Sequence, residues 1–266
     1  MKIIKDLSLK LVNWYSLVVL LSVWISASMV SDDPNYLLVL LTTVIVIFFL
    51  IADCLIGVKI NSPLVTNKYV LYSLIFFIVG LFLSLILSQF IFFFLLIIGG
   101  LLYVQRYLSE QLYFINIIIL SLLAGCTFWL SGMAIKPNMI SFLPGSIFPS
   151  IIIFLYTAIY LIIDESIKIS ENRSKMIIPF IQKITASQSI LTAIIILFAM
   201  ILLSYWPILN NWYSNMYKII FVYVIELPLL GFLIFVWGNP IKGMLSIAQI
   251  IMKLNIVLGF TALFFA

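Results

Sequence analysis

The sequence predicts an all-α fold, a bundle of about nine membrane-spanning helices. Of its 266 residues, 65% are hydrophobic and 9% are charged, which leaves too few polar side chains to cover a water-exposed surface. The apolar residues form continuous runs of about 20 residues, the length of helix that crosses the hydrocarbon core. They do not alternate with polar residues, as the strands of a membrane barrel do. The chain is therefore predicted to be an integral membrane protein.

The nine apolar stretches are expected to form one membrane domain covering residues 1–266, because no Gly/Ser linker or charged domain separates them. The first is expected to stay as an uncleaved helix, and a signal peptide ending near Ser28 is the alternative. The third and fourth are separated only by Ser88 and Gln89, so eight or ten spans are further alternatives. The spans are 13–31, 36–57, 69–88, 90–108, 113–134, 143–163, 189–206, 217–237 and 243–265.

Basic residues set the expected orientation in the membrane. With a cytoplasmic start, the inside segments hold eleven Lys and Arg residues and the outside segments hold only Lys136 and Lys218, while Lys253 lies within a span. Positive charge collects on the cytoplasmic side of membrane proteins, so the N-terminus is predicted inside the cell and the C-terminus outside. The net charge of +5 then faces anionic lipid headgroups, and no basic domain suggests a nucleic-acid partner.

Several types of site are disfavoured by composition. The chain has no histidine, the most common general base and transition-metal ligand. Cys54 and Cys126 lie in different spans and are expected to be buried small residues, since two such cysteines make neither a disulfide framework nor a metal site.

Two cytoplasmic connectors are longer than the others, one at 58–68 and one from Asp164 to Gln188. In the second, Asp164 and Lys168 are four residues apart, and so are Glu171 and Lys175. On a helix that continues from the sixth span these groups would share a face and pair. A solvated helical extension held by such surface pairs is one interpretation.

A binding site for diphosphate is the other interpretation of these acidic connectors. The acids Asp53, Asp164, Glu165 and Glu171 lie at or near the cytoplasmic ends of spans two and six. Magnesium is commonly bound by a few carboxylates together with substrate phosphates. Asp53 lies within span two, where a carboxylate is costly unless it faces a cavity or a partner.

Glu226 and Lys253 are expected near the middle of the bilayer, on spans eight and nine. Isolated charges at that depth are costly, so an intramembrane ion pair is the main prediction. A proton or ion pathway is the alternative. Pro228 is expected to kink span eight next to Glu226.

The nine-span plan with two polar cytoplasmic connectors resembles the UbiA family of intramembrane prenyltransferases. In that family the first connector carries Asn-Asp-x-x-Asp-x-x-x-Asp followed by Asn-x-Pro, and Asn61-Ser62-Pro63 resembles this ending. The second carries Asp-x-x-Asp-x-x-x-Asp followed by Leu-Pro, and Asp164, Ile167 and Glu171 occupy its spacing before Ile178-Pro179. Further positions that fit are Tyr103, Arg106, Asn116, Gly125 and Gly132.

The sequence departs from these motifs at the acids. The expected aspartates of the first motif fall on Ile51, Cys54 and Val58, and Asp53 is one place out of register. In the second motif the middle aspartate is Ile167. The resemblance therefore implies a divergent member with a weak magnesium site.

The resemblance implies transfer of a polyprenyl group from a diphosphate donor to a lipophilic acceptor, such as an aromatic ring, within the cell membrane. The implied ligands of Mg²⁺ are Asp164, Glu171 and, less well placed, Asp53. The implied diphosphate contacts are Asn61, Arg106, Lys168, Arg173 and Lys175. Two alternatives stay open: a non-catalytic UbiA-fold protein that binds lipid or a partner, and a small transporter that uses Glu226 and Lys253.

Overall fold

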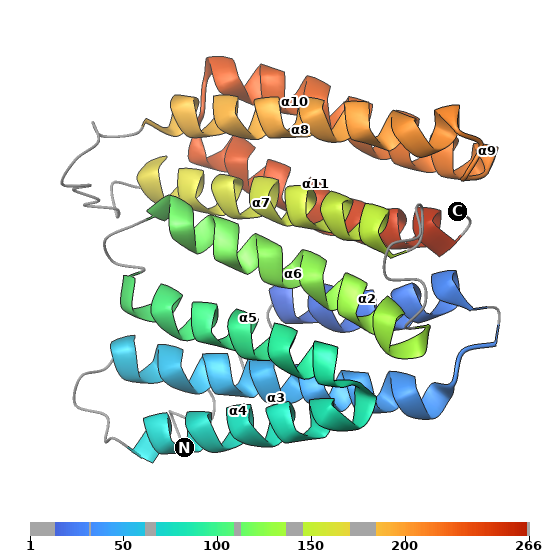
Figure 1. Cartoon of the computed structure of the whole chain (residues 1–266). Coiled ribbons are helices and arrows are strands. Elements are labelled where there is room, and N and C mark those ends of the chain that lie inside the picture. Colours follow the sequence, from blue (N-terminus) through green and yellow to red (C-terminus); the bar gives the residue numbers. More distant parts are fainter. Residues whose placement is uncertain are drawn as a thin grey trace. The chain divides into compact units, whose positions relative to one another are not determined.

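The computed structural model of the chain describes residues 14–31, 33–61, 68–108, 113–136, 146–170 and 185–264, and these residues are helical apart from short connections (Figure 1). They divide into two compact units, Met1–Ser150 and Ile151–Ala266, which are treated separately. The single domain expected from the sequence stays a prediction.

The first unit is built from five helices in its described part. They are α2 (Trp14–Val30), α3 (Tyr36–Asn61), α4 (Lys68–Leu87), α5 (Gln89–Leu108) and α6 (Tyr113–Ile135). Helix α3 packs against α4, α5 and α6, and its core side chains Ile45 and Phe49 meet Leu81, Leu95 and Leu123 from those helices. The core is entirely apolar, as expected where helix association depends on close packing rather than on exclusion of water.

Helices α2 and α6 are joined by two hydrogen bonds in opposite directions. Ser26 Oγ donates to the carbonyl of Phe128 at 2.7 Å, and Ser131 Oγ donates to the carbonyl of Val23 at 2.8 Å. Gly132 of α6 is also tightly packed, because a Cβ there would lie 2.5 Å from the side chain of Ser146, which precedes α7, and 3.1 Å from Ser26 Oγ of α2. Small residues at such a contact are typical of membrane helix pairs.

The second unit consists of most of α7 (Ile147–Ser170), α8 (Ala186–Leu209) and a final pair of rods. The first of these two rods is a continuous helix whose type changes along its length. It begins as α9 (Asn215–Tyr217), continues as the π-helix η2 (Lys218–Glu226) and ends as α10 (Leu227–Gly238). The last is α11 (Lys242–Phe264).

Local sequence explains where α8 begins and ends. Thr185 accepts from the Gln188 backbone, and the Gln188 side chain accepts from the Thr185 backbone, so the two residues form a capping box. At the other end Asn211 has a φ of 54°, a conformation that Asn tolerates well. The chain turns there, and Ser214 caps the next helix.

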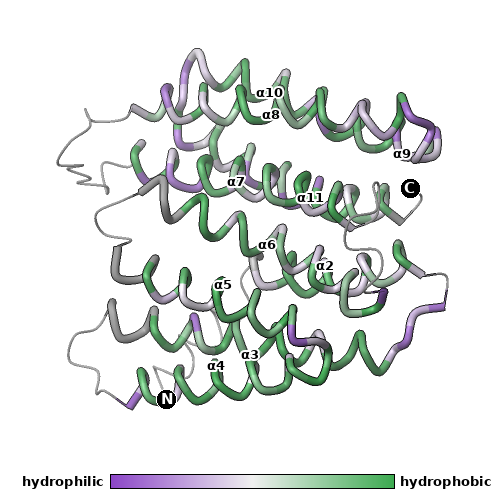
Figure 2. The backbone as a smooth tube through the Cα atoms, in the orientation of Figure 1, coloured by the Kyte–Doolittle hydropathy of each residue, from purple (hydrophilic) through white to green (hydrophobic). Residues whose placement is uncertain are grey.

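The chain is a multi-pass integral membrane protein. In the described part, seven helices are long and apolar enough to cross a membrane, and Ser16–Val30 and Gln89–Val104 are shorter apolar helices. Figure 2 shows hydrophobic residues along the length of the helices and hydrophilic ones mainly near their ends. Large apolar side chains such as Leu37, Phe82 and Phe235 are two-thirds or more exposed, as expected for side chains that face lipid.

Each of the nine predicted spans coincides with one helical rod, and the predicted break between the third and fourth is confirmed at Ser88, whose hydroxyl accepts from the Ile91 backbone. Several boundaries differ from the prediction by three or more residues: α3 ends at Asn61 instead of 57, α7 begins at Ile147 instead of 143, and α8 ends at Leu209 instead of 206. Helix α7 also continues to Ser170 instead of ending at 163, and α8 begins at Ala186 instead of 189. Charged and polar side chains lowered the hydropathy there, although the helix continued through them.

Candidate functional site

The end of α7 carries a cluster of three charged side chains. Lys168 Nζ lies 3.0 Å from Asp164 Oδ2 and 2.5 Å from Glu165 Oε1. The Asp164–Lys168 spacing of four residues was expected to produce this pair, and the prediction is confirmed. The side chains of Lys168, Asp164 and Glu165 are 49%, 35% and 18% exposed, so the cluster is only partly open to solvent.

Helix α11 supplies a partner for this cluster that the sequence did not predict. Gln249 Nε2 donates to Asp164 Oδ1 at 2.8 Å and lies 3.4 Å from the Tyr160 hydroxyl. One turn further from the cluster, the Tyr156 hydroxyl donates to the Met252 carbonyl at 2.9 Å. Tyr156, Tyr160, Asp164 and Lys168 follow at intervals of four residues and therefore lie on one face of α7.

This polar face could have been found in part from sequence, because its four members repeat every fourth residue. The role of Gln249 could not, since it lies 85 residues from Asp164 and nothing in its local sequence indicates a partner. Together these residues form a polar stripe, defined as Tyr156, Tyr160, Asp164, Lys168 and Gln249, where α7 and α11 meet.

The described residues do not fit a magnesium centre. Among them, no three His, Cys, Asp or Glu side chains are close enough to hold a metal ion. Both oxygens of Asp164 already have partners, and the Lys168 ammonium occupies the position between Asp164 and Glu165 that a cation would take. Magnesium prefers several oxygen ligands in near-octahedral geometry, and this cluster offers two carboxylates bound to one ammonium.

Other predicted site residues are not placed by the structure. Glu171, Arg173 and Lys175 lie outside the described residues. Asn61 and Arg106 lie on α3 and α5, but their side chains are outside the described part.

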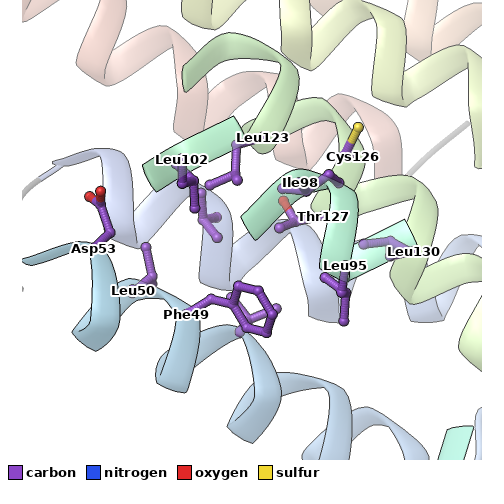
Figure 3. Close-up of a pocket in the computed structure, with 12 residues that line it drawn as sticks. Phe49, Leu50, Asp53, Leu95, Ile98, Leu102, Leu123, Cys126, Thr127 and Leu130 are labelled. Atoms are coloured by element: carbon purple, nitrogen blue, oxygen red, sulfur yellow. The ribbon is translucent and has the colours of Figure 1, made fainter. Parts of the chain in front are cut away.

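Asp53 lines an apolar pocket within the first unit (Figure 3). The pocket encloses about 460 Å³ of atom-free space, including its open side. Asp53 lies at one edge of the labelled side chains in Figure 3 and is the only ionisable acid among the residues of this lining. The lining comes from α2, α3, α5 and α6: Val19, Val46, Phe49, Leu50, Asp53, Leu95, Ile98, Leu102, Leu123, Cys126, Thr127 and Leu130.

The backbone beside Asp53 is tied to two neighbouring helices. Ser73 of α4 donates to the carbonyl of Ala52 at 2.7 Å, and its hydroxyl lies 2.8 Å from the Tyr103 hydroxyl of α5. Tyr103 also makes an edge contact with Phe77. These bonds connect the turn of α3 that carries Asp53 to α4 and α5.

The expected ion pair of Glu226 and Lys253 is absent, although the structure describes both residues. Glu226 is fully buried and accepts a hydrogen bond from Ser204 Oγ of α8 at 2.7 Å. The pair was expected because the positions of Glu226 and Lys253 in the sequence place both near the middle of the bilayer. Depth alone does not make two side chains face each other, and Glu226 is directed toward α8.

These observations define a polytopic α-helical membrane protein with a charged cluster at the end of one helix and an apolar pocket in its first unit. A solved structure of digeranylgeranylglyceryl phosphate synthase in membranes has the same arrangement of helices, with a TM-score of 0.75 over 99% of this chain and 98% of that one, at 19% identity. That protein is a UbiA-family membrane prenyltransferase. The chain therefore has the UbiA fold, as the resemblance in its sequence implied. Comparison of the sequence with family models and with curated proteins gives no match.

Proposed function

We propose that the chain is a UbiA-like membrane prenyltransferase, which transfers a polyprenyl group from a diphosphate donor to a lipophilic acceptor. The observation that carries the proposal is the charged end of α7, where Lys168 is held by Asp164 and Glu165 at the position of the second acidic motif. The UbiA fold supports it, because a solved structure with that fold is a digeranylgeranylglyceryl phosphate synthase.

Lys168 is well placed to bind a diphosphate. Ammonium groups are common phosphate ligands, and about half of the Lys168 side chain is exposed. If Lys168 turns toward a phosphate, Asp164 still keeps its hydrogen bond from Gln249. The move therefore does not leave Asp164 without a partner. Arg173 and Lys175, which follow in the sequence, are predicted to add positive charge.

The chemistry requires charge stabilisation on the leaving group. The C–O bond of the allylic diphosphate breaks, its electron pair remains on the diphosphate, and an allylic cation forms. The Lys168 ammonium would stabilise the negative charge of the departing diphosphate. The acceptor then bonds to the cation and loses a proton. As a separate proposal about the first unit, we expect the apolar pocket around Phe49 and Leu102 to hold an isoprenoid chain.

Binding of geranylgeranyl diphosphate to the purified protein tests the donor site. We expect saturable binding that Lys168→Ala weakens about ten-fold or more, because a hydrogen bond to a charged group contributes about 1.5–3 kcal/mol. Lys136→Ala is the matched control, since Lys136 is an exposed lysine that directly follows α6 and belongs to the other unit. No saturable binding, or an equal loss in both variants, would reject the donor site.

Magnesium is still predicted from the resemblance, with Asp164, Glu171 and Asp53 as its ligands. The same titration in Mg²⁺ and in chelator tests it, and the resemblance predicts tighter binding with the metal. Asp164→Ala should then remove the difference, whereas Asp33→Asn, a change at an exposed acid between α2 and α3, should not. Equal affinity in both buffers would leave Lys168 as the cation of the site.

A non-catalytic UbiA-fold protein that binds lipid or a partner is the second candidate. Its support is that both oxygens of Asp164 have partners and that no group of three or more His, Cys, Asp or Glu side chains among the described residues could hold a metal ion. Membranes containing the overproduced protein and labelled geranylgeranyl diphosphate separate the two functions. Label that moves into lipid, with loss of the transfer in Lys168→Ala, supports the enzyme. Binding without transfer supports the second candidate.

A further inference from the structure

The buried carboxylate of Glu226 has only one of its two oxygens satisfied. The residue is 0% exposed, and Ser204 Oγ donates to its Oε1 at 2.7 Å. Its Oε2 has no hydrogen-bond partner. An unpaired charged oxygen in an apolar interior is costly, so such an atom calls for an explanation.

A second buried polar atom beside it also lacks a partner. Tyr217 is 0% exposed and its hydroxyl makes no hydrogen bond. Tyr217 belongs to α9 and Glu226 to η2, and η2 packs against both α9 and α8, the helix that carries Ser204. Three fully buried oxygen-bearing side chains therefore lie on the neighbouring elements α8, α9 and η2 of the second unit, and two of them, Tyr217 and Glu226, have an oxygen without a hydrogen-bond partner.

The backbone at this place is irregular. Residues Lys218–Glu226 form a π-helix, in which the Leu227 N–H reaches back five residues to the Val222 carbonyl. Pro228 follows, and its missing N–H leaves one carbonyl in the preceding turn without its helical donor. Short π-helical segments within α-helices are often found at functional sites, and here the segment ends on Glu226.

No basic side chain neutralises Glu226. Among the described residues, the titratable groups that interact with it electrostatically are Tyr205 and Tyr217, and both are phenols. Lys253 of α11 does not pair with it. Where α11 packs against η2, Gly259 meets the apolar side chains of Phe221 and Ile225. Within the part of the chain that the structure describes, no ammonium or guanidinium group therefore meets the free oxygen of Glu226.

We propose that Ser204, Tyr217 and Glu226 form a buried binding site for one monovalent cation, with Na⁺ as the ion of best chemical fit. Carboxylate and hydroxyl oxygens are the ligands that hard cations prefer. One carboxylate balances one positive charge, whereas a divalent ion would leave an uncompensated charge in the apolar interior. A water molecule would satisfy the hydrogen bonds but not the charge.

Thermal unfolding of the purified protein tests the site. Choline chloride is replaced stepwise by NaCl at constant ionic strength and constant pH. A ligand that binds only the folded state raises the unfolding temperature with its concentration, so we expect a saturable rise in Na⁺. Glu226→Gln, which keeps the size of the side chain, should abolish the rise.

Two milder variants are also measured, so that the site can still be tested if Glu226→Gln does not fold. Ser204→Ala and Tyr217→Phe each remove one oxygen ligand, and each should raise the half-maximal Na⁺ concentration roughly five- to ten-fold. Ser189→Ala is the matched control, because Ser189 is also a buried serine on α8 with an unpartnered hydroxyl. It should leave the half-maximal concentration unchanged.

Three results would overturn the proposal. An unfolding temperature that is the same in Na⁺ and choline would leave only a bound water. A temperature that changes with pH but not with Na⁺ would assign a proton to Glu226 instead. A Na⁺ response that survives in Ser204→Ala, Tyr217→Phe and Glu226→Gln alike would place the ion elsewhere. Binding of geranylgeranyl diphosphate is independent of all three results.

Discussion

Asp164 Oδ2 lies 3.0 Å from Lys168 Nζ, one helical turn away on α7, while its other oxygen accepts from Gln249 of α11 at 2.8 Å. The acid that matches the first position of the second motif is thus occupied on both sides by residues of this chain. A lysine takes the place that a metal ion would have, and an amide from another helix fixes the carboxylate's orientation. Among the described residues, Asp164 therefore has a lysine as its cationic partner, and a direct experiment can test whether the cluster also accepts a metal ion.

Changing Gln249 to Glu should convert this cluster into a better metal site. A third carboxylate would then lie beside Asp164 and Glu165, and like charges that close repel each other. We expect the unfolding temperature of Gln249→Glu to fall in chelator and to rise more with Mg²⁺ than that of the unchanged protein. Gln89→Glu, at an exposed position of α5, is the control. A magnesium response no larger than the control's would contradict the prediction.

Gly132 should be sensitive to a single methyl group. The Cβ of Gly132→Ala would lie 2.5 Å from Ser146 and 3.1 Å from Ser26 Oγ, so Ser146, and to a smaller extent Ser26, would have to move. We expect a loss of about 1–3 kcal/mol in stability, the usual cost of overpacking, measured by unfolding in detergent. Gly100→Ala is the matched control, because nothing lies within 4 Å of its added Cβ. An equal effect at both positions would argue against close packing at Gly132.

The crossed hydrogen bonds of Ser26 and Ser131 should each contribute modestly to the same contact. Ser131→Ala removes the bond to the Val23 carbonyl, and such bonds average about 0.6 kcal/mol in membrane proteins. Ser28→Ala is the control, since that hydroxyl bonds only within its own helix, to Ile25. The measurement is the free energy of unfolding in mixed detergent. A loss in Ser28→Ala as large as in Ser131→Ala would show that the interhelical bond contributes little.

Cys126 offers a chemical probe of the apolar pocket. It is partly exposed and lines the pocket, whereas Cys54 is buried. If an isoprenoid chain occupies the pocket, geranylgeranyl diphosphate should slow modification of Cys126 by a small uncharged thiol reagent. Inorganic diphosphate, which has no hydrocarbon chain, should give no protection. Cys126→Ser identifies the labelled residue, and labelling that is equally fast with and without the lipid would contradict the proposal.

The helices were predictable from sequence because hydropathy alone marks them. Hydropathy does not, however, reveal irregular backbone geometry within a helix. In the uniformly apolar stretch around Phe221 and Val222, nothing distinguishes a π-helical turn from an α-helical one. The helical extension Asp164–Ser170 was read as a connector because its charges lower the hydropathy, although those charges pair along the helix.

The site was predictable only where its parts are local. Asp164 and Lys168 are four residues apart, so their pairing followed from helix geometry. Gln249 and Ser204 were not found, because their partners lie 85 and 22 residues away in the sequence. The expected pairing of Glu226 with Lys253 used depth in the membrane and ignored the direction in which each side chain points.

The distribution of basic residues predicts which side of the membrane carries the charged end of α7. Eleven Lys and Arg residues lie in the segments assigned to the inside and two in those assigned to the outside. Fusions that end after Asn211 should therefore give active alkaline phosphatase, which folds only outside the cytoplasm. Fusions that end after Lys242 should instead give fluorescent cytoplasmic reporter protein. Changing the three lysines Lys2, Lys5 and Lys10 to Gln should weaken this preference, because the first helix usually dominates orientation. The reverse pattern in the unchanged chain would place Asp164 and Lys168 outside and rule out a cytoplasmic diphosphate donor for them.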